Sequence, residues 1–329
     1  MVRIVRFHRL GGPEVLEIEQ GDVPEPLEGE VRIQARAFGL NRAETLFRRG
    51  VYIEQPDLPS GTGLEMAGVV ESVGRRVTGL SVGDRVALVP PISMRTAPAH
   101  AELVNVAAEF VVPIPASQSF EEAAATWMAY LTAYGALLEL AALGAGDRVV
   151  ITAASSSVGL AAIQIANAVG AVPIAVTRSD LKRAALFAAG AAHVVVSDRE
   201  GIADIVRGIL GDGAPRVLFD AVGGRLLPEL VAAAANGGII ISYGAQDAVP
   251  SELPPAALLA KSLTLRGYLV HELIRDAPKL AAAKAFVLKH LASGALRPTI
   301  SQTFPLEEIQ QAYECLESSE QFGKIVVTV

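Results

Sequence analysis

Side chains suited to holding a phosphate group lie close together near the middle of the chain. The stretch Thr177-Arg178-Ser179 follows a short apolar run, Val172–Val176, and Lys182 comes four residues after Arg178. Two hydroxyls and two cations in this spacing can hydrogen-bond and neutralise a phosphate. A bare ribose hydroxyl would instead need a carboxylate at the end of the strand, and the nearest one, Asp180, is better placed to cap a helix. The alternative is that the two cations are solvated charges on a helix surface.

The spacing of apolar residues predicts the elements that would position these side chains. Val149–Thr152 is a β-branched run and predicts a buried strand. Val158–Val169 has helical spacing and stops at Gly170, Val172–Val176 predicts a second strand, and a second helix is expected from Asp180. Strand, turn, helix and strand in this order are typical of the start of a dinucleotide-binding sheet.

The turn between the first strand and its helix, Ala153–Ser157, consists of small residues. Unpaired N–H groups and the dipole at the start of a helix favour an anion, and small side chains let a pyrophosphate approach the backbone. The usual glycine fingerprint is depleted, because Ser156 and Ser157 stand where glycines are common and only Gly159 remains. The turn therefore predicts a pyrophosphate site, with an ordinary strand-to-helix turn as the alternative.

The composition indicates a compact globular protein. Of 329 residues, 51% are hydrophobic and 19% charged, which excludes a disordered chain. The net charge of −7 disfavours a nucleic-acid surface. No apolar run approaches the roughly 20 residues of a membrane span, and the basic, alternating N-terminus does not resemble a signal peptide. The single cysteine, Cys315, excludes an internal disulfide framework. We therefore expect a cytoplasmic protein without a membrane partner.

Two kinds of patterning divide the chain. Short alternating strands, separated by Gly and Pro, predict a twisted, barrel-like β domain in the first part. These strands are Val2–Arg6, Val15–Glu19, Val31–Ala37, Met66–Val73, Arg85–Val89, one around Val104, and Val111–Ile114.

From Ser119 onward, helices alternate with strands, which predicts a doubly wound parallel sheet. Its expected elements, beyond those above, are the helical stretch Phe120–Leu140 and the strands Val194–Val196, Val217–Phe219, Gly238–Ser242 and Leu263–Arg266. A helix (Ala277–Ser293), a turn-rich stretch (Pro298–Phe304) and a last strand (Lys324–Val329) then indicate a return to the first domain.

A series of short motifs runs the length of the chain. In order they are Phe7–Leu16 (FHRLGGPEVL), Gly39–Glu44 (GLNRAE), Arg48–Tyr52 (RRGVY), Gly63–Val70 (GLEMAGVV), Val82–Val86 (VGDRV), Leu131–Tyr134 (LTAY), Asp220–Gly224 (DAVGG) and Gly323–Val326 (GKIV). Together they resemble the zinc-independent quinone oxidoreductase (zeta-crystallin-like) branch of the medium-chain dehydrogenase/reductase superfamily. The resemblance implies an α/β protein with a GroES-like catalytic domain, residues 1–122 and 267–329. A Rossmann domain, residues 123–266, interrupts it, and the cofactor lies in the cleft between the two.

The resemblance also bears on metal chemistry. Zinc-dependent relatives place a cysteine soon after the motif Asn41–Glu44 and a histidine where Leu64 stands. No cysteine precedes Cys315, and the five histidines lack metal-ligand spacing. We therefore expect no metal site, and direct hydride transfer to an electron-poor acceptor, either a quinone or an α,β-unsaturated carbonyl (an enone).

The cofactor implied by the resemblance and by Thr177, Arg178, Ser179 and Lys182 is NADPH, since the matching lysine of relatives holds the 2′-phosphate. Carried over position by position, the resemblance implies three further groups of contacts. At the pyrophosphate these are Ser156, Ser157 and Val158; at the nicotinamide end they are Asn41, Arg42, Leu46 and Thr132. Around the rest of the cofactor they are Val222, Tyr243, Gly244, Ala245, Gln246, Gly267, Tyr268, Leu269 and Gly323. Ser197 stands where many relatives carry a tyrosine beside the adenosine phosphate.

Tyr52 is the one candidate for a catalytic side chain. It matches a family tyrosine that lies over the nicotinamide, where it could orient a carbonyl or deliver a proton, and a packing aromatic is the alternative. The open edge strand Leu263–Arg266 predicts a homodimer, which the resemblance also implies.

Two other function classes remain open. One is a non-catalytic, NADPH-binding protein of the crystallin or sensing type, and the other is an RNA-binding reductase relative. The acidic balance and the lack of a basic aromatic stripe disfavour the second.

Overall fold

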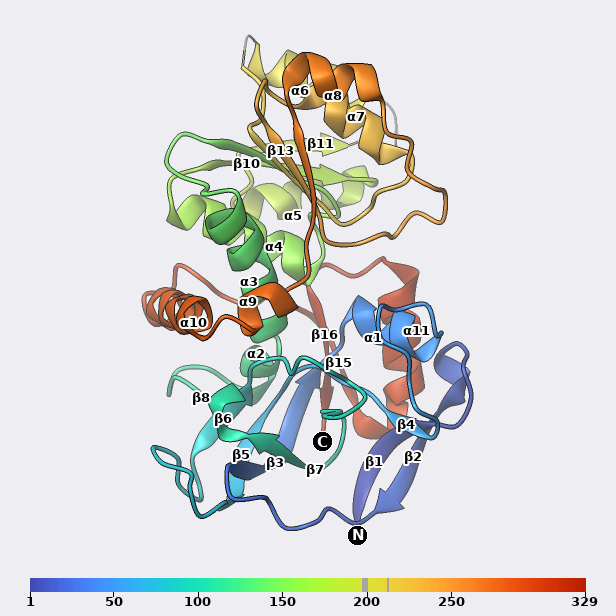
Figure 1. The fold of residues 1–329 in the computed structure, drawn as a ribbon, viewed down its shortest axis with the longest axis vertical. Coiled ribbons are helices and arrows are strands. Elements are labelled where there is room, and N and C mark those ends of the chain that lie inside the picture. Colours follow the sequence, from blue (N-terminus) through green and yellow to red (C-terminus); the bar gives the residue numbers. More distant parts are fainter. Residues whose placement is uncertain (197–200, 212) are drawn as a thin grey trace. The chain divides into compact units, whose positions relative to one another are not determined.

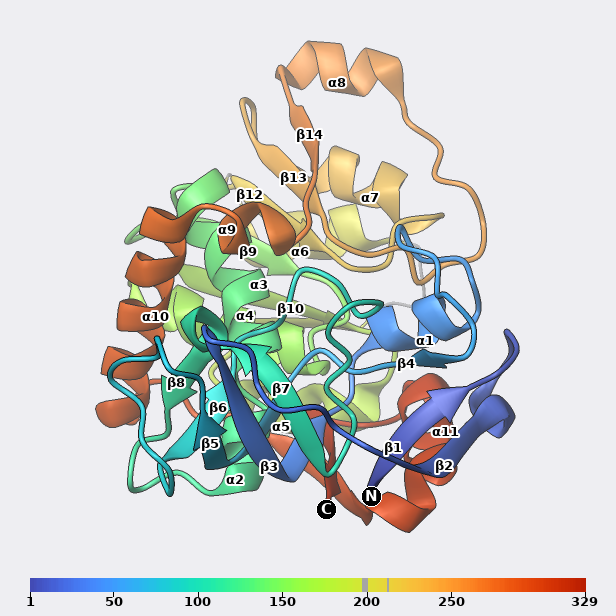
Figure 2. The ribbon, with the colours of Figure 1, turned by 60° about the horizontal axis from the view of Figure 1, so that its bottom comes forward.

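The computed structural model describes residues 1–196, 201–211 and 213–329 (Figure 1). The chain divides into two compact units: unit 1 is Met1–Met128 with Arg297–Val329, and unit 2 is Ala129–Leu296. Both ends of the chain belong to unit 1 (Figure 2). Among the helices of the described residues, none has the length and apolar character needed to cross a membrane.

Unit 1 is the predicted β domain. Its larger sheet has the order β15-β16-β3-β5-β6-β8, with β7 also paired to β3, and a smaller sheet has the order β2-β1-β4. In the long strand β3, Val31, Ile33, Ala35 and Ala37 are buried, because alternate side chains point into the core. The strands are β1 Val2–Phe7, β2 Leu16–Gly21, β3 Glu30–Gly39, β4 Ser60–Gly61, β5 Met66–Val73, β6 Arg85–Leu88, β7 Leu103–Ala107, β8 Val111–Pro113, β15 Ile300–Pro305 and β16 Lys324–Thr328.

Short helices complete unit 1. Helix α1 begins after Asn41, where Asn41 and Glu44 form a capping box, and α11 packs against β15 and β16. The α-helices are α1 Arg42–Arg48, α2 Phe120–Ala124 and α11 Ile309–Ser318, and the 3₁₀ turns are η1 Pro13–Val15, η2 Ala108–Phe110 and η5 Leu306–Glu308.

Unit 2 is the predicted doubly wound sheet. Its strands are parallel and have the order β11-β10-β9-β12-β13-β14. Successive strands run outward from β9 to one side and from β12 to the other, so the order reverses between β9 and β12. Ligands of such sheets bind at this reversal, beyond the carboxyl ends of the strands. The strands are β9 Arg148–Ile151, β10 Val172–Thr177, β11 His193–Val196, β12 Val217–Asp220, β13 Ile239–Ser242 and β14 Thr264–Gly267.

The helices of unit 2 connect and cover these strands. They are α4 Ser157–Ala168, η4 Asp180–Lys182, α5 Arg183–Ala188, α6 Ile202–Leu210, α7 Leu226–Ala233, α8 Pro255–Lys261, α9 His271–Ile274 and α10 Ala277–Ala292. The helical stretch expected over Phe120–Leu140 is divided into α2, α3 (Trp127–Tyr134) and a π-helical segment η3 (Gly135–Leu140). The division falls at Thr126, whose hydroxyl donates to Glu122 O at 2.7 Å and so belongs to the end of α2.

The stretch Pro298–Phe304 was expected to be turn-rich, and that prediction is wrong. Strand β15 occupies most of it and pairs in parallel with β16. Ser301, Gln302 and Thr303 are all exposed, so this edge strand has no apolar alternation from which it could be recognised.

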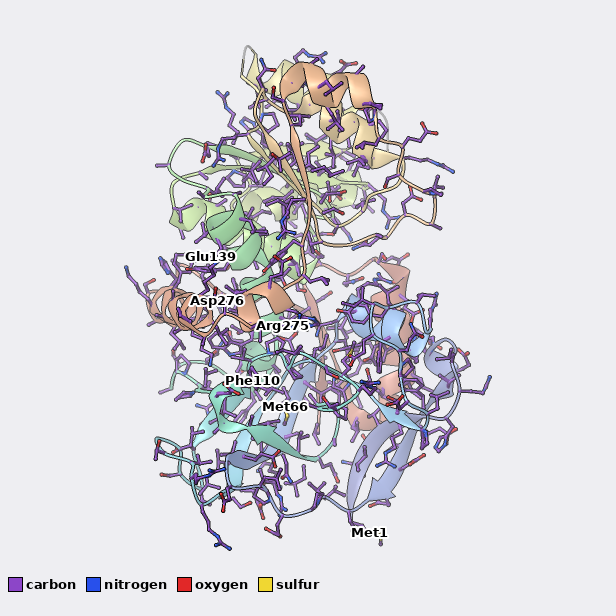
Figure 3. The ribbon with its side chains drawn as sticks, viewed as in Figure 1. Met1, Met66, Phe110, Glu139, Arg275 and Asp276 are labelled. Carbon is purple, nitrogen blue, oxygen red and sulfur yellow. The ribbon has the colours of Figure 1, made fainter. Side chains whose placement is uncertain are left out.

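The compact units also differ from the expected domain boundaries, because residues 267–296 lie in unit 2. The hydroxyl of Tyr268 packs directly against Gly135, and the rings of Phe286 and Tyr134 have centroids 5.3 Å apart. Lys279 Nζ lies 3.9 Å from Glu139 and 3.8 Å from Asp276, both labelled in Figure 3. These contacts join Tyr268 and α10 to α3 and η3.

Candidate cofactor site

The turn from β9 to α4 has the geometry of an anion site. Ser156 caps α4, because its hydroxyl oxygen accepts a hydrogen bond from Gly159 N at 3.0 Å. A Cβ at Gly159 would lie 2.7 Å from both Ala153 O and Ala154 Cα, so only glycine lets the helix approach the turn this closely. Ser157 and Val158 form the first turn of α4, where backbone N–H groups lack intrahelical partners. The three residues predicted to hold the pyrophosphate therefore lie together at a helix N-terminus.

Lys182 lies against this same turn. Its Nζ donates to Ser155 Oγ at 3.1 Å, and Ala154 N donates to Val176 O at 3.2 Å, which ties the turn to β10. The ammonium is thus placed where the ends of β9 and β10 meet. Sequence reasoning missed Ser155 as a functional residue, although it is the first of three consecutive serines in the turn.

Ser179, and not Asp180 as the sequence suggested, caps the turn that follows β10, because its hydroxyl oxygen accepts from Leu181 N at 3.3 Å. Thr177 Oγ1 accepts from Ser179 N at 3.4 Å. Asp180 forms an ion pair with Arg183 at 2.6 Å, so this carboxylate is already neutralised. Arg178 is exposed, and no described residue hydrogen-bonds or ion-pairs with it. An anionic ligand would therefore meet two cations here and one already neutralised acid.

A buried polar corner joins β9 to β12 at the reversal of the sheet. The carboxylate of Asp220 accepts from Thr152 Oγ1 at 2.7 Å and from Val222 N and Gly223 N at 2.9 Å each. Burial raises the pKa of Asp220, and these three hydrogen bonds oppose the rise. The corner fixes the backbone around Val222, one of the predicted contacts.

Tyr243 lies beside this corner. Its ring stacks on Phe219 with centroids 4.0 Å apart, and its backbone N donates to Asp220 O at 2.9 Å. The hydroxyl is buried beside the side chain of Ser156, without a well-formed hydrogen bond in the described part of the chain. A dinucleotide bound at this turn would complete its hydrogen bonding.

Other predicted contacts in unit 2 are more dispersed. Gly244, Ala245 and Gln246 follow β13, and a Cβ at Gly244 would lie 2.7 Å from Ala221 O. Gly267 is the last residue of β14, and Tyr268 and Leu269 follow it; β12 and β13 separate this strand from β9. Thr132 is buried on α3. Ser197 lies outside the described residues.

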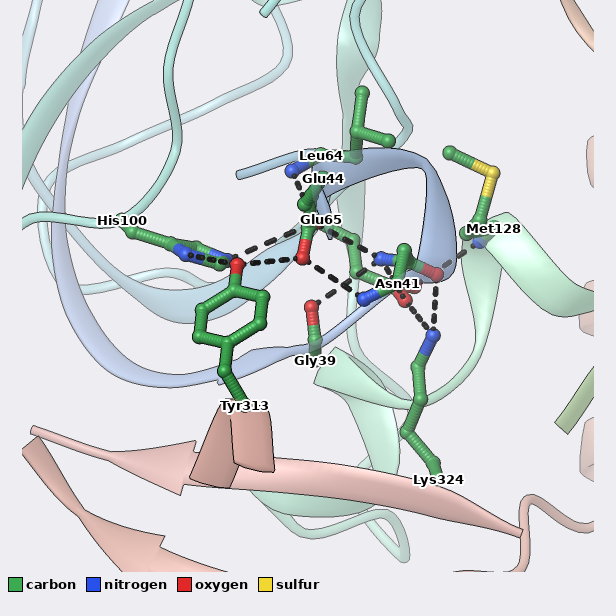
Figure 4. A network of polar contacts seen from close by, with 9 residues as sticks. All are labelled: Gly39, Asn41, Glu44, Leu64, Glu65, His100, Met128, Tyr313 and Lys324. Carbon is green, nitrogen blue, oxygen red and sulfur yellow. Dashed lines mark hydrogen bonds and ion pairs between the residues drawn. The ribbon is translucent and has the colours of Figure 1, made fainter. Parts of the chain in front are cut away.

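In unit 1, Asn41 is the hub of a buried network (Figure 4). Its side-chain NH₂ group donates to Gly39 O, Glu44 Oε1 and Glu65 Oε1, at 3.3, 3.2 and 3.1 Å. Its side-chain oxygen accepts from Lys324 Nζ at 2.7 Å. The amide is thereby satisfied by the protein itself, so Asn41 would meet a cofactor through the shape of its side chain.

The remaining predicted contacts of unit 1 are engaged in packing and backbone geometry. The guanidinium of Arg42 donates to Leu316 O at 3.0 Å and to Ser319 Oγ at 2.7 Å, at the end of α11. Leu46 is half-buried on α1. Gly323 has φ +107°, and a Cβ there would lie 2.3 Å from Thr299 O, so the turn into β16 needs glycine.

Glu44 connects the Asn41 hub to His100 and Tyr313. It accepts from Asn41 N and Tyr313 Oη at 2.8 Å each, and from Leu64 N at 3.0 Å. Burial raises the pKa of Glu44, and the donors from Asn41 and Tyr313 oppose the rise. His100 stacks on Phe38 with ring centroids 4.2 Å apart, and burial lowers its pKa to about 3.

This burial predicts a specific pH dependence of stability. A histidine with a depressed pKa contributes stability above its ordinary pKa of about 6.5 and loses it as pH falls toward its folded value, at about 1.4 kcal/mol per pH unit. Glu44 and Glu65 have raised pKa values and contribute with the opposite sign. The contribution of His100 is therefore isolated by comparison with His100→Phe, which keeps the stacked ring.

Between pH 7.5 and 5.0, we expect the free energy of unfolding of the unmodified protein to fall by about 2 kcal/mol more than that of His100→Phe. Urea titrations at the two pH values measure this difference. An equal pH dependence in the two proteins would mean that His100 accepts a proton in the folded state at its ordinary pKa.

Tyr52 is half-buried, and its environment keeps it protonated. Burial, with Glu54 and Glu44 as further contributors, raises the pKa of Tyr52 to about 12. A phenol with this pKa stays neutral at physiological pH, so it can donate a hydrogen bond to a developing oxyanion. Nothing in its surroundings activates it as a stronger acid.

One group of possible metal ligands occurs in the described part of the chain. His8, Glu17 and Glu19 lie together on the smaller sheet of unit 1. The group is largely exposed and His8 contacts Glu19 directly, as is ordinary for a surface ion pair. Leu64, at the position of the superfamily's zinc-binding histidine, is buried and apolar.

Comparisons with known proteins agree with this architecture. The alcohol dehydrogenase GroES-like domain matches residues 27–116, and the zinc-binding dehydrogenase model matches residues 157–285. The quinone oxidoreductase of Lama guanicoe is 32% identical over 99% of this chain and 97% of its own length. The structure of Escherichia coli quinone oxidoreductase complexed with NADPH has a TM-score of 0.90 and 30% identity, covering 99% of this chain and 100% of that one. A structure described as an NAD-dependent alcohol dehydrogenase has a TM-score of 0.88 and 31% identity, covering 99% of each chain.

The strand order and the two family models define the class of the protein, which is an oxidoreductase built from GroES-like and Rossmann-type units. The similar structure complexed with NADPH supports a nicotinamide cofactor. Within this class, the full-length similarity to quinone oxidoreductases identifies the family. The chain belongs to the quinone oxidoreductase family of the medium-chain dehydrogenase/reductase superfamily.

Proposed function

We propose that the protein is an NADPH-dependent reductase of quinones or activated alkenes and works without zinc. The relatives alone do not decide the cofactor, because similar structures include one with NADPH and one described as NAD-dependent. The observation that carries the proposal is the placement of Lys182 on Ser155, beside the neutralised Asp180 and beside Arg178, which pairs with no described residue. This set favours a phosphate over a ribose hydroxyl.

The bound cofactor would supply a hydride, and the residues of the chain would hold the cofactor and stabilise the charge that develops on the acceptor. Ser156, Ser157 and the N-terminus of α4 would hold the pyrophosphate, while Arg178 and Lys182 would hold the 2′-phosphate. Tyr52 would donate a hydrogen bond to the acceptor oxygen, where negative charge develops during reduction. A solvent proton completes the reduction, so one NADPH and one proton convert a quinone to a hydroquinone.

A turnover screen with NADPH and NADH against quinones, enones and aldehydes tests this function. We expect NADPH consumption with quinones or enones and little with aldehydes, because no Lewis acid polarises a simple carbonyl. Tight NADPH binding without turnover of any acceptor would contradict the proposal and favour the non-catalytic, crystallin-like alternative.

Zinc independence rests on the donor set. Leu64 offers no ligand atom, and the only cysteine of the sequence is Cys315. We expect purified protein to contain far less than one zinc per chain and to keep its activity after treatment with a chelator. One tightly bound zinc per chain, lost together with activity, would contradict this part of the proposal.

A homodimer through β14 is the expected assembly. This strand ends the sheet, and Thr264–Gly267 are all exposed, so a second copy can pair with its outer edge once the hydrogen bond from Arg266 to Gly267 O is displaced. Light scattering at micromolar concentration should report twice the chain mass of 34.4 kDa. Replacing Leu265 by Pro removes an N–H donor and should shift the mass to that of the monomer. A monomeric parent protein would refute this assembly.

A further inference from the structure

A buried ion pair lies in the network of Figure 4 and has no direct part in holding the proposed ligands. Lys324 and Glu65 are 2% and 1% exposed, and the ammonium contacts Glu65 Oε1 directly. A buried charge is costly to desolvate, and removing one partner of such a pair leaves the other uncompensated. The question is what this costly arrangement holds in place.

One oxygen of the pair holds the start of helix α3. Glu65 Oε2 accepts from Met128 N at 3.0 Å, and Met128 is the second residue of that helix. N–H groups in the first turn of a helix lack intrahelical partners, and an acidic group there also complements the helix dipole.

No residue next to α3 in the sequence supplies this cap. Thr126, which directly precedes the helix, donates its hydroxyl to Glu122 O at 2.7 Å and accepts from Gln118 Nε2 at 2.9 Å. Its side chain therefore serves the end of α2. The side-chain cap of α3 comes from Glu65, which is distant in sequence.

The same pair orients Asn41. Lys324 Nζ donates to Asn41 Oδ1 at 2.7 Å, and Glu65 Oε1 accepts from Asn41 Nδ2 at 3.1 Å. The amide thus meets a cation at its oxygen and a carboxylate at its nitrogen, so only one orientation of the amide is favourable.

Gly39 makes room for the pair. A Cβ at Gly39 would lie 2.8 Å from Lys324 Cε, 2.9 Å from Glu65 Oε1 and 2.3 Å from Ala124 O. The motifs that begin at Gly39, Gly63 and Gly323 are far apart in the sequence, and each contributes one part of this arrangement. The spacing of these motifs in the sequence did not predict that their side chains meet.

We propose that Lys324 and Glu65 are positioning residues, which together fix Asn41 and the first turn of α3. The proposal rests on the proposed function only in taking Asn41 as a contact of the nicotinamide end.

Lys324→Met tests the proposal, because it keeps the length of the side chain and removes its charge. Amide hydrogen exchange in the segment 127–134 should accelerate about tenfold or more as the first turn of α3 loosens. With quinone as acceptor, kcat should fall about tenfold or more through misplacement of Asn41. The Kd for NADPH should stay within about twofold, since the phosphate contacts lie in unit 2. Lys324→Arg keeps the charge and should restore most of kcat.

Two further variants complete the test, one as a replacement if Lys324→Met does not fold and one as a control. Glu65→Gln with Lys324→Met leaves no unpaired charge buried, so it is measured in place of Lys324→Met if that variant does not fold, with the same expected losses. Lys261→Met is the matched control. This lysine bonds to carbonyls at the end of α7, including Ala232 O at 2.7 Å and Ala234 O at 2.9 Å, and its loss should change neither kcat nor exchange in 127–134.

Unchanged exchange in 127–134, or unchanged kcat in the folded variant, would overturn the positioning role. Absence of turnover in the unmodified protein would contradict the proposed function instead. The exchange measurement would then still decide whether the pair holds α3.

Discussion

The double variant Arg178→Ala with Lys182→Ala is expected to lose the preference for NADPH over NADH. Each charge-assisted hydrogen bond to a partly exposed phosphate contributes roughly 1.5–3 kcal/mol. Losing one should raise KM for NADPH about tenfold or more, and losing both about a hundredfold or more. NADH lacks the 2′-phosphate, so its kcat/KM should change little. Steady-state kinetics with both cofactors and one quinone measure the ratio.

Two single variants sharpen this test. Ser155→Ala removes the hydroxyl that receives Lys182 Nζ at 3.1 Å and should cause a smaller loss, confined to NADPH. Arg207→Ala is the matched control, because Arg207 is an exposed arginine of unit 2 that pairs with Asp204 on α6, and this pair has no part in the proposed phosphate site. A double variant that keeps its preference, or an unmodified protein that uses NADH equally well, would make Arg178 and Lys182 surface charges.

The parallel sheet of unit 2 was predictable because its signals are local. Val149–Thr152 and Val172–Val176 are buried β-branched runs with clear turn residues around them, and the structure places β9 and β10 there with shifts of a single residue. The carboxyl ends of adjacent parallel strands meet at one edge. Sequence order alone therefore brought Ser156 and Lys182 to the same region.

The environment of Lys182 was less predictable. Its bond to Ser155 depends on side-chain directions across two strands, and a hydroxyl in a small-residue turn carries no pattern of its own. Strand β15 was missed for a related reason, since its exposed edge position permits the polar sequence Ser301-Gln302-Thr303.

The buried network of unit 1 could not be derived from the sequence. Glu44, Glu65 and Lys324 are residue types that usually lie at the surface, and they are brought together by the register of β3, β5 and β16. Resemblance marked Asn41 as a cofactor contact, but its amide is committed to the protein. Only the three-dimensional contacts distinguish a residue that touches a ligand from one that is held beside it.

Replacing Tyr52 by Phe is expected to lower turnover on the order of 10²-fold, if the hydroxyl donates to the developing oxyanion. The phenylalanine keeps the ring and its packing. KM for NADPH should change little, because the lost interaction forms mainly as charge develops on the acceptor. The burial that raises the pKa of Tyr52 to about 12 keeps the phenol protonated, so the rate difference between the two proteins should be constant from about pH 6 to 9.

Tyr134→Phe serves as the matched control for the loss of a hydroxyl. That hydroxyl lies in unit 2 and bonds to Glu139 Oε1 at 3.3 Å, so its removal should leave turnover unchanged. A Tyr52→Phe protein with full activity would make Tyr52 a packing residue and leave direct hydride transfer unaffected. A rate difference that disappears within pH 6 to 9 would instead mean that Tyr52 ionises near neutrality. Its burial beside Glu54 and Glu44 argues against that result, because both effects stabilise the neutral phenol.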